Sequence, residues 1–338
     1  MPTRPKCLMT THHSLMHPSE NISDYDLLTV VVPVYNREHL VANTLDSIIS
    51  GAVRYLHLVI VDNNSTDNTL QVLQEWKKEH ENLSWLKTTV VTEKTPGAAA
   101  ARNRGLREAS TPWVMFFDSD DTMTPGHIPA IINHISETSS AQLLTWQIRI
   151  HLLGGEVIQT KPLSADILTS QLIHCPLATQ NYAVRTDLIR AVGAWDDSIL
   201  RWDDWELGVR LLLANPEIES VTTSGVDIFR QEDSMTGTSY FSKRGEWEKA
   251  IDKVSRLVRE SDLKTDLKSV LLFAADYRRA LLAAEYYREN HKKEAAALLK
   301  NATAHYSFRK KILLKWAFHH TRRGFRGAWT ILKTLSLV

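Results

Sequence analysis

The chain has 338 residues, of which 43% are hydrophobic and 23% charged, with a formal net charge of +1. These values are ordinary for a globular protein with one large or two smaller domains, and they exclude an overall attraction to nucleic acid. Two cysteines, Cys7 and Cys175, exclude a disulfide framework. Because neither a signal-peptide-like run nor about 18 consecutive apolar residues occur, we expect a cytoplasmic chain that does not cross a membrane.

The N-terminal half alternates between two hydrophobic patterns. Residues 1–26 are polar and predict a disordered tail. From Leu27 onward, strands are predicted at LLTVVVPVY, LHLVIV, SWLKTTVVT and PWVMFF, and helices at HLVANTLDSIIS, TLQVLQEWKKEH and PGAAAARNRGLREA. This alternation is typical of parallel βαβ units in an open α/β sheet, whose ligands bind beyond the carboxyl ends of the strands.

Mixed and then helical patterns follow. Helices are predicted at HIPAIINHISE, RTDLIRAVG and WDDWELGVRLLL, and strands at QLLTWQIRIHLL and GEVIQT. From Arg244 the pattern is almost purely helical. The sequence therefore predicts an α/β domain over residues 27–235 and a helical region over residues 236–338.

Three carboxylates follow the fourth predicted strand, in the segment FFDSDD. Asp118, Asp120 and Asp121 would repel one another unless a positive charge lies nearby. Strand alternation would place Asp118 and Asp120 on one side, where their oxygens suit Mg²⁺ or Mn²⁺. The alternative is that these acids only cap a turn.

The other strand ends carry polar groups as well. PVYN places an aromatic ring and an amide at this edge, and DNNSTDN precedes a helix N-terminus, which favours anions. The small residues of PGAAAARNRGL allow close backbone approach, and Arg102 would meet nucleotide or phosphate groups. A simple turn, a helix cap and a solvated helix face are the respective alternatives.

Five segments, in this order and at these spacings, resemble the family 2 glycosyltransferases. They are VVVPVYNRE at 30–38, VIVDNNSTDNT at 59–69, PGAAAARNRGL at 96–106, WVMFFDSDD at 113–121 and GAWDDSILRWDDWELGVRLL at 193–212. The resemblance covers residues 27–235 and implies the GT-A fold, a Rossmann-like, mostly parallel sheet flanked by helices, followed here by a C-terminal helical extension. It also implies a nucleotide-sugar donor lying across the carboxyl edge of the sheet.

The resemblance assigns residues to the donor base. Pro33 and Tyr35 would line the base pocket, and Asp62 and Asn63 would read the base with help from Arg102. The family commonly has two adjacent acids where this chain has Asp62 and Asn63. Because an amide can also pair with the imide edge of uracil or thymine, a UDP-sugar is favoured and a dTDP-sugar is the alternative.

The resemblance also assigns the acids. Asp118 would face the ribose, and Asp120 would coordinate Mn²⁺ or Mg²⁺ at the donor diphosphate. The segment RWDDWELGVR resembles the family's Glu-Asp-Trp-Asp motif, with Asp203 in place of Glu and Asp204 matching the general base of an inverting displacement. The alternative is that Asp203 or Asp204 caps a helix.

Two nearby segments are harder to interpret. Asp196 and Asp197 resemble a structural turn of the family and rank below Asp204 as the base. Many relatives have a histidine after the arginine of the IFRQEDSMTG segment, but this chain has Gln231 and Glu232, which leaves the third metal ligand open. Arg230 would meet the diphosphate.

The acceptor is expected to be a saccharide or a lipid-linked glycan. His174, Cys175, Gln180 and Trp195 are candidates for its pocket, with packing in the protein core as the alternative.

The C-terminal segment 301–338 has eight Lys or Arg and no acids, interleaved with Trp316, Phe318, Phe325 and Trp329. This composition is typical of a helix on an anionic membrane surface. The alternative is packing against the rest of the protein or a second copy, and nucleic acid is not expected as a partner.

The sequence thus predicts a metal-dependent, inverting glycosyltransferase of cell-surface glycan biosynthesis, peripheral on the inner face of the membrane. One alternative is an inactive nucleotide-sugar-binding or scaffold protein. Another is a nucleotidyltransferase, which would need a Gly-rich basic loop after the first strand, where this chain has PVYNRE.

Overall fold

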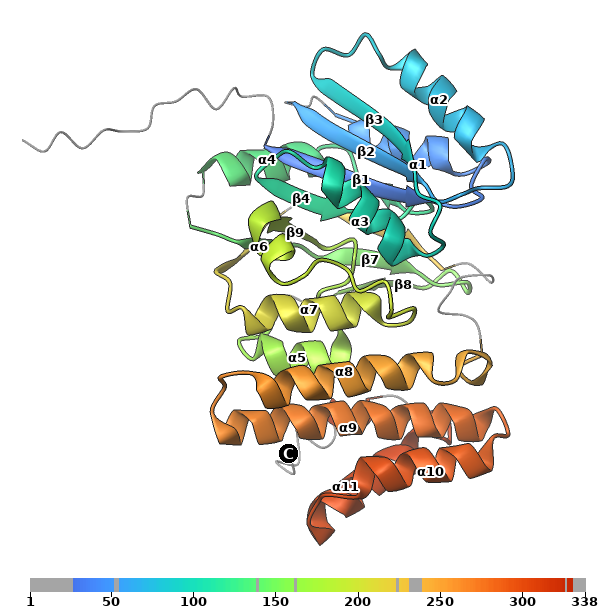
Figure 1. The fold of residues 1–338 in the computed structure, drawn as a ribbon, viewed down its shortest axis with the longest axis vertical. Helices are drawn as coiled ribbons and strands as arrows, with labels where there is room; N and C mark the ends of the chain where they lie inside the picture. Colours follow the sequence, from blue (N-terminus) through green and yellow to red (C-terminus); the bar gives the residue numbers. More distant parts are fainter. Residues whose placement is uncertain are drawn as a thin grey trace, which may run out of the picture.

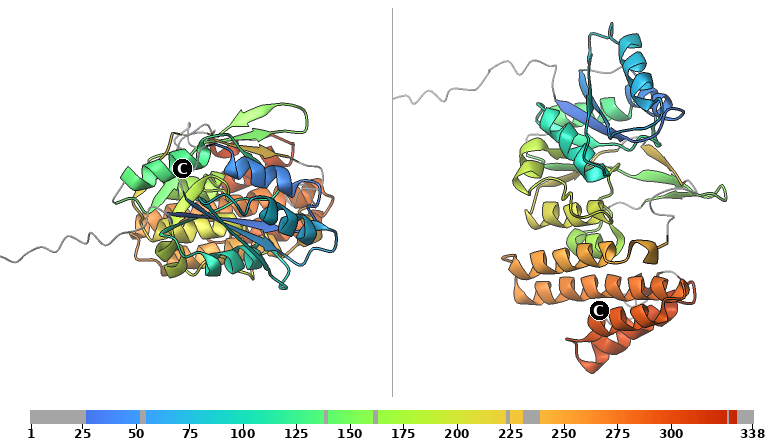
Figure 2. Two further views of the ribbon diagram at one scale, coloured as in Figure 1. Left: turned by 90° about the horizontal axis from the view of Figure 1, so that it is seen from above. Right: turned by 45° about the vertical axis from the view of Figure 1, so that its right-hand side comes forward.

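A computed structural model of the chain describes residues 27–51, 55–137, 140–160, 163–222, 225–230, 239–325 and 327–330. The predicted tail, residues 1–26, and the predicted domain boundary at 235–236 lie outside the described residues. In Figure 1 and in the right-hand view of Figure 2, a sheet with its helices forms the upper part of the molecule, and a stack of helices forms the lower part.

The larger sheet has seven strands in the order β10-β6-β9-β4-β1-β2-β3. Their bounds are β1 (Leu28–Val34), β2 (Leu56–Asp62), β3 (Leu86–Thr92), β4 (Trp113–Phe116), β6 (Leu143–Thr145), β9 (Tyr182–Arg185) and β10 (Ile218–Ser220). All pairs are parallel except those of β9, which runs antiparallel to both β4 and β6. The predicted mostly parallel α/β sheet is confirmed.

A smaller sheet borders the end of β4. Its strands, in the order β5-β11-β7-β8, are β5 (Thr122–Met123), β11 (Val226–Phe229), β7 (Ile148–His151) and β8 (Val157–Gln159). The single strand predicted at QLLTWQIRIHLL is wrong, because the segment divides between the two sheets around Trp146. The indole of Trp146, between β6 and β7, is buried and donates to the Gln180 carbonyl at 3.0 Å.

Seven helices of the described chain accompany the sheets. They are α1 (Val41–Ile49), α2 (Thr69–Glu79), α3 (Ala98–Glu108), α4 (His127–Glu137), α5 (Ile167–His174), α6 (Thr186–Ala191) and α7 (Asp203–Leu213). Alternate residues of β1 pack into two separate cores: Val30 and Val32 against α1 and α4, and Val31 against α3. A Cβ at Gly105 of α3 would clash with the Val31 side chain, so glycine permits the close packing that sets the position of α3.

The C-terminal region is helical, as predicted. It consists of a short 3₁₀ helix (Phe241–Lys243), α8 (Glu246–Glu260), α9 (Thr265–Arg288), α10 (Lys292–Thr303) and α11 (Phe308–Thr321). Its hydrophobic core also contains Leu172 of α5 and Trp205 and Val209 of α7. Figure 1 shows α5 and α7 between the sheet and α8, so these two helices join the regions through one continuous core.

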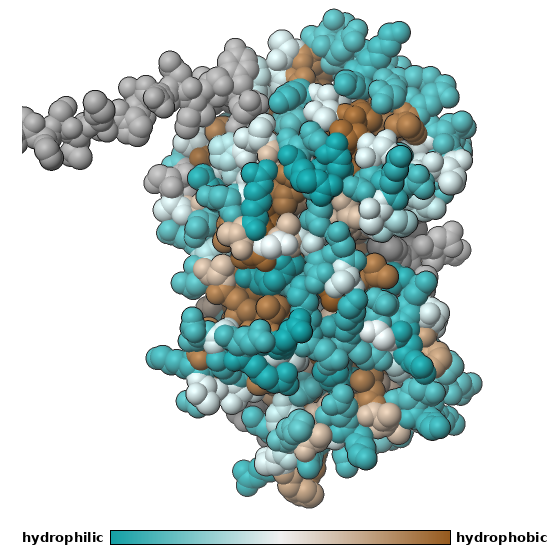
Figure 3. Space-filling model, in the orientation of Figure 1, coloured by the Kyte–Doolittle hydropathy of each residue, from teal (hydrophilic) through white to brown (hydrophobic). Residues whose placement is uncertain are grey.

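Aromatic residues of the basic C-terminal segment pack mostly inward. Phe318 and Trp329 are buried, and Trp316 is partly buried against the same helical core, whereas Phe325 is 57% exposed. On the face drawn in Figure 3, hydrophobic surface forms small separate patches within a hydrophilic surround. In the part of the chain that the structure describes, no helix is long and apolar enough to span a membrane.

Candidate functional site

The carboxyl ends of β1 and β2 meet at one edge of the large sheet, where Val34 pairs with Asp62. Hydrogen bonds join the loops beyond these strands. The backbone amide of Asn36 donates to Ser65 Oγ at 3.0 Å, and the backbone amide of Arg37 donates to Thr69 Oγ1 at 2.8 Å. Both loops are therefore held as one surface beside the end of β4.

The carboxylate cluster lies in a turn rather than in the strand. β4 ends at Phe116, so the expectation that strand alternation aligns Asp118 with Asp120 is wrong. Gln180 Nε2 instead bridges Asp118 Oδ2 at 2.6 Å and Asp121 Oδ2 at 2.8 Å. Asp120 turns to another partner, Arg37, whose Nη2 lies 3.2 Å from Asp120 Oδ2.

Crowding of these carboxylates changes their acidity. Burial raises the pKa of Asp120, the neighbouring Asp118 raises it further, and Arg37 opposes the rise. Burial, together with Asp118, raises the pKa of Asp121 to about 8. The predicted repulsion within the cluster is therefore only partly relieved by the protein's own cations and amides.

Arg102 of α3 connects this cluster to the second acidic segment. Its buried guanidinium donates through Nη2 to Asp118 Oδ1 at 2.8 Å and through Nη1 to Asp203 Oδ2 at 2.9 Å. It also lies over the Trp195 ring, 4.5 Å from the centroid. Because the guanidinium already holds two carboxylates, its contact with the donor stays a prediction.

Asp204 lies in the first turn of α7. Trp202, just before the helix, has a left-handed backbone with φ of 57°, which is unusual for an aromatic residue. Its ring is held between Trp205, Trp247 and Arg278. Strained backbone that is fixed by its surroundings is common at functional sites.

The carboxylate of Asp204 has a raised pKa. Burial is the largest cause, and with the adjacent Asp203 it raises the pKa of Asp204 to about 6. Asp204 Oδ1 accepts a hydrogen bond from the Trp205 amide at 2.7 Å. A carboxylate with a pKa nearer to neutrality takes up a proton more readily than an ordinary Asp and stays mostly ionised at pH 7.

The base-pocket candidates gather at the ends of β1 and β2. Asp62 is 2% exposed, and its Oδ1 has no hydrogen-bond partner among the described residues. Its Oδ2 accepts from the Ser65 amide at 3.4 Å. Pro33 is partly buried, and Tyr35 is 55% exposed. A buried carboxylate oxygen without a partner is rare and indicates a place for a donor group.

Asn63 has a structural role in this arrangement. Its amide nitrogen donates to the carbonyls of Glu93 at 3.0 Å and Thr95 at 2.7 Å, and its carbonyl accepts from the Gly97 amide at 2.8 Å. Both amide hydrogens are engaged, so Asn63 fixes the loop before α3. A contact with the base would use the remaining lone pair of its carbonyl, and this contact stays a prediction.

The lower-ranked acids have local partners. Asp196 Oδ2 pairs with Lys253 Nζ at 2.5 Å, and Asp197 Oδ1 accepts from Asn103 Nδ2 at 2.7 Å. Lys253 of α8 also pairs at 2.7 Å with the buried Glu206 of α7. These contacts anchor α7 to its surroundings and agree with a structural turn at GAWDDS.

The four candidate residues for the acceptor pocket do not lie together in the structure. Gln180 and Trp195 are buried beside Asp118 and Arg102, and burial raises the pKa of the Cys175 thiol. His174 is exposed and lines a pocket below α7.

Two arginines of the site were not identified from the sequence as site residues. Arg37 lies inside a recognised segment, where its charge next to the acids is a usable signal. Arg278 lies in the middle of α9, and only the fold brings it under α7.

Asp120 is the residue that offers a carboxylate to a metal ion. Among the described residues no cluster of three His, Cys, Asp or Glu is arranged to hold an ion. Asp120 is half-buried and faces the loop edge, and an ion bound there would take its other ligands from diphosphate oxygens and water, as Mg²⁺ commonly does. Gln231 and Glu232 lie outside the described residues.

Solved structures share this fold. Residues 1–349 of S. aureus TarS, in complex with UDP-GlcNAc, superpose with a TM-score of 0.64 at 18% identity, covering 88% of this chain and 92% of that one. The mannosyltransferase PcManGT from Pyrobaculum calidifontis, in complex with GDP-Man and Mn²⁺, has a TM-score of 0.52 at 20% identity, covering 93% of this chain and 85% of that one. The fold is that of the GT-A class, as predicted.

Part of the chain is similar in sequence to known glycosyltransferases. The model for glycosyl transferase family 2 matches residues 29–159. The putative teichuronic acid biosynthesis glycosyltransferase TuaG of Bacillus subtilis is 32% identical over 115 residues, which cover 34% of this chain and 44% of TuaG. Residues 29–159 of the chain therefore match glycosyltransferase family 2, the family that the sequence motifs predicted. Its matches span from 15% to 50% of the length of several curated relatives.

Proposed function

We propose that the chain is a metal-dependent, inverting glycosyltransferase. It transfers a sugar from a UDP-sugar, with a dTDP-sugar as the alternative, to a hydroxyl of a saccharide or lipid-linked glycan in cell-surface glycan biosynthesis. The observation that carries the proposal is the ion pair of Arg102 with both Asp118 and Asp203. It joins the acids at the donor edge of the sheet to the helix turn that carries Asp204.

The donor base would bind at the ends of β1 and β2. The unpaired Oδ1 of Asp62 would accept the N3–H of uracil, because a buried acceptor gains most from such a bond. Pro33 and Tyr35 would line the same pocket. The UDP-GlcNAc complex of the structurally similar TarS supports the choice of a uridine nucleotide.

Asp204 would act as the general base. As the acceptor oxygen attacks the anomeric carbon, its proton passes to the Asp204 carboxylate, and the bond from that carbon to the diphosphate breaks with its electron pair leaving on the phosphate oxygen. A single displacement of this kind inverts the anomeric configuration. The hydrogen bonds of Arg102 to Asp118 and Asp203 hold the start of α7 beside the donor edge of the sheet.

Asp120 would hold Mn²⁺ or Mg²⁺ when the donor is present, and the ion would neutralise charge that develops on the departing diphosphate. Arg37, 3.2 Å from Asp120, would lie beside the same phosphates. The Mn²⁺ complex of PcManGT is consistent with this assignment.

The metal assignment predicts a binding defect that is independent of catalysis. In calorimetry with Mn²⁺, Asp120→Ala should bind UDP about tenfold more weakly than wild type, because the ion loses its protein ligand. Asp187→Ala, which changes an exposed acid on α6, is the matched control. Equal UDP affinity in the wild-type protein and Asp120→Ala would exclude this role.

Contact with the inner face of the membrane through residues 301–338 is a further part of the proposal. The basic composition of this segment supports membrane contact. Phe318 and Trp329 pack inward, so these two aromatic residues are not available as membrane anchors. We expect sedimentation with anionic phosphatidylglycerol vesicles and less with neutral phosphatidylcholine vesicles, with the difference reduced by salt. Equal sedimentation with both kinds of vesicle would contradict the membrane contact.

A further inference from the structure

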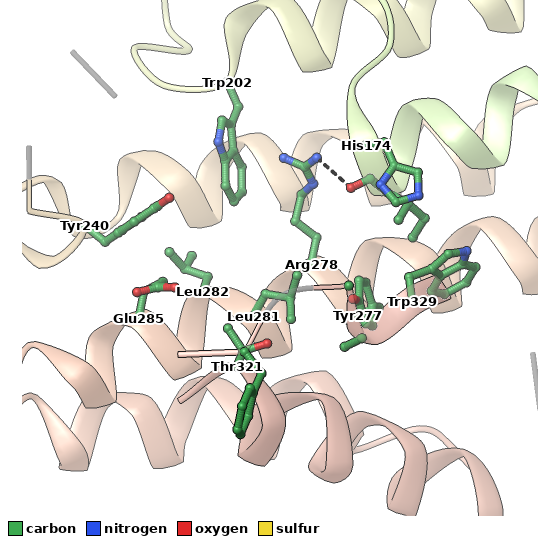
Figure 4. A pocket seen from close by; sticks show the side chains of 14 residues that line it. His174, Trp202, Tyr240, Tyr277, Arg278, Leu281, Leu282, Glu285, Thr321 and Trp329 are labelled. Atoms are coloured by element: carbon green, nitrogen blue, oxygen red, sulfur yellow. Dashed lines mark hydrogen bonds between the residues drawn. The ribbon is translucent and has the colours of Figure 1, made fainter. Parts of the chain in front are cut away.

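A pocket of about 370 Å³ lies where the catalytic domain meets the helical region. Figure 4 shows that Trp202 and His174 enter it from the α7 and α5 side, and that Arg278 and Glu285 reach it from α9. Tyr277 and Trp329 form a further wall. The volume lies within the range of small-molecule sites, roughly 300–1,000 Å³.

The pocket is connected to the proposed base through Trp202. The ring of Trp202 lines the pocket, while its left-handed backbone begins the helix turn that carries Asp203 and Asp204. Arg278, at the centre of the pocket in Figure 4, interacts electrostatically with Asp204. A ligand that rests on Trp202 would therefore lie beside the residue that starts the catalytic helix.

The walls combine aromatic faces with polar groups. Trp202, Tyr240, Tyr277 and Trp329 contribute rings, and the carboxylate of Glu285 accepts from Arg288 Nη1 at 2.8 and 3.1 Å. The carboxylate oxygens of Glu285 are acceptors at the pocket wall, which suits a ligand that carries hydroxyl donors. A pyranose ring has this complementary character, with an apolar C–H face and hydroxyls around its edge.

Contacts within the protein fix the orientation of Arg278. Its Nε and Nη2 donate to the carbonyls of Leu172 at 3.0 Å and Ile173 at 3.3 Å, and its guanidinium lies between the rings of Trp202 and Trp205. These contacts fix the guanidinium in place, and Glu285 puts a carboxylate into the same pocket, where it would repel a phosphate group. The chemistry therefore favours a neutral sugar over a phosphate-bearing unit.

We propose that this pocket binds a neutral sugar unit of the acceptor. The inference rests on the proposed glycosyltransferase function and adds a substrate class and a location for acceptor specificity. The helical region, which lies beyond the residues matched by the family model, would then select the acceptor while the sheet edge binds the donor. Tyr240 and Glu285 would recognise hydroxyls, and Trp202 would stack on the ring.

The test measures saccharide binding to the full chain in the presence of UDP and Mg²⁺, which is diamagnetic and does not broaden NMR signals. The probes are maltose, cellobiose, lactose and N,N′-diacetylchitobiose. Each saccharide is titrated to millimolar concentration, and its binding is measured by saturation-transfer NMR. At least one probe should bind the wild-type protein. Leu281→Trp, which fills the pocket, and Glu285→Gln should each weaken that binding by about tenfold, with UDP affinity unchanged.

Leu267→Trp places the same substitution at an exposed position of α9 and should bind the probe as wild type does. If Leu281→Trp does not fold, Glu285→Gln decides the result. No binding of any probe to wild type, or undiminished binding in the folded pocket variants, overturns the inference. UDP binding is measured separately. If the wild-type protein does not bind UDP, that result contradicts the proposed function and not the pocket assignment.

Discussion

Replacement of Asp204 by Asn should lower the rate of sugar transfer by about 10²- to 10⁴-fold, the usual contribution of a general base. UDP affinity should remain near that of wild type, because Asp204 lies on α7 and not among the base-pocket residues. Asp197→Asn is the matched control, since Asp197 contacts Asn103 in the nearby turn. Unchanged transfer in Asp204→Asn would show that the base is another residue.

The same assay gives a pH signature. As the proposed general base, Asp204 would act in its ionised form. Its raised pKa of about 6 should then place the acid limb of the rate profile near pH 6 instead of near pH 4. Transfer should therefore fall as the pH drops below about 6. A wild-type protein that binds donor but transfers no sugar at any pH would favour the inactive scaffold alternative.

Replacement of Arg102 by Met should destabilise the protein by about 3 kcal/mol, at the lower end for loss of one partner from a buried ion pair. The variant would leave Asp118 and Asp203 facing each other without the cation, and both carboxylates keep some access to water, which limits the loss. The free energy of unfolding can be measured by urea denaturation.

Arg104→Met provides the control on the same helix. Arg104 pairs with Glu108 at a less buried position, and loss of this pair should cost about 1 kcal/mol or less. Equal losses in Arg102→Met and Arg104→Met would show that the bridge between the two acidic segments does not stabilise the fold.

The centre of the fold was predictable from local patterns. β1 and β2 are continuous apolar runs because both faces of these strands are buried, and α1, the helix between them, has one apolar face. The carboxyl ends of parallel strands lie at one edge, so the proximity of Tyr35 and Asp62 also followed from order along the chain.

Other parts depend on tertiary contacts that no local pattern shows. β9 is four residues long and inserts antiparallel between β4 and β6, and its buried residues resemble any short apolar segment. α5 was not predicted, although Asp166 caps it by accepting from the Thr169 amide.

The candidate site shows the same division. The sequence identified the acids but not their partners, because the bonds from Arg102 to Asp118 and Asp203 depend on the packing of α3 against Val31. Arg278 comes near Asp204 only through the docking of α9 against α5. Contacts between charged residues that are distant in the chain produce no local sequence pattern from which they could be predicted.

Donor binding tests the central claim most directly. The purified full chain is heated with Mn²⁺ and UDP, UDP-sugars, dTDP or GDP, because a ligand that binds the native state raises its stability by about 2.7 kcal/mol at a concentration of 100 times Kd. The account predicts that UDP and at least one UDP-sugar, or their dTDP counterparts, raise Tm more than GDP does. It also predicts that Asp62→Ala removes this rise. No rise with any pyrimidine nucleotide, or an equal rise in Asp62→Ala, would contradict it.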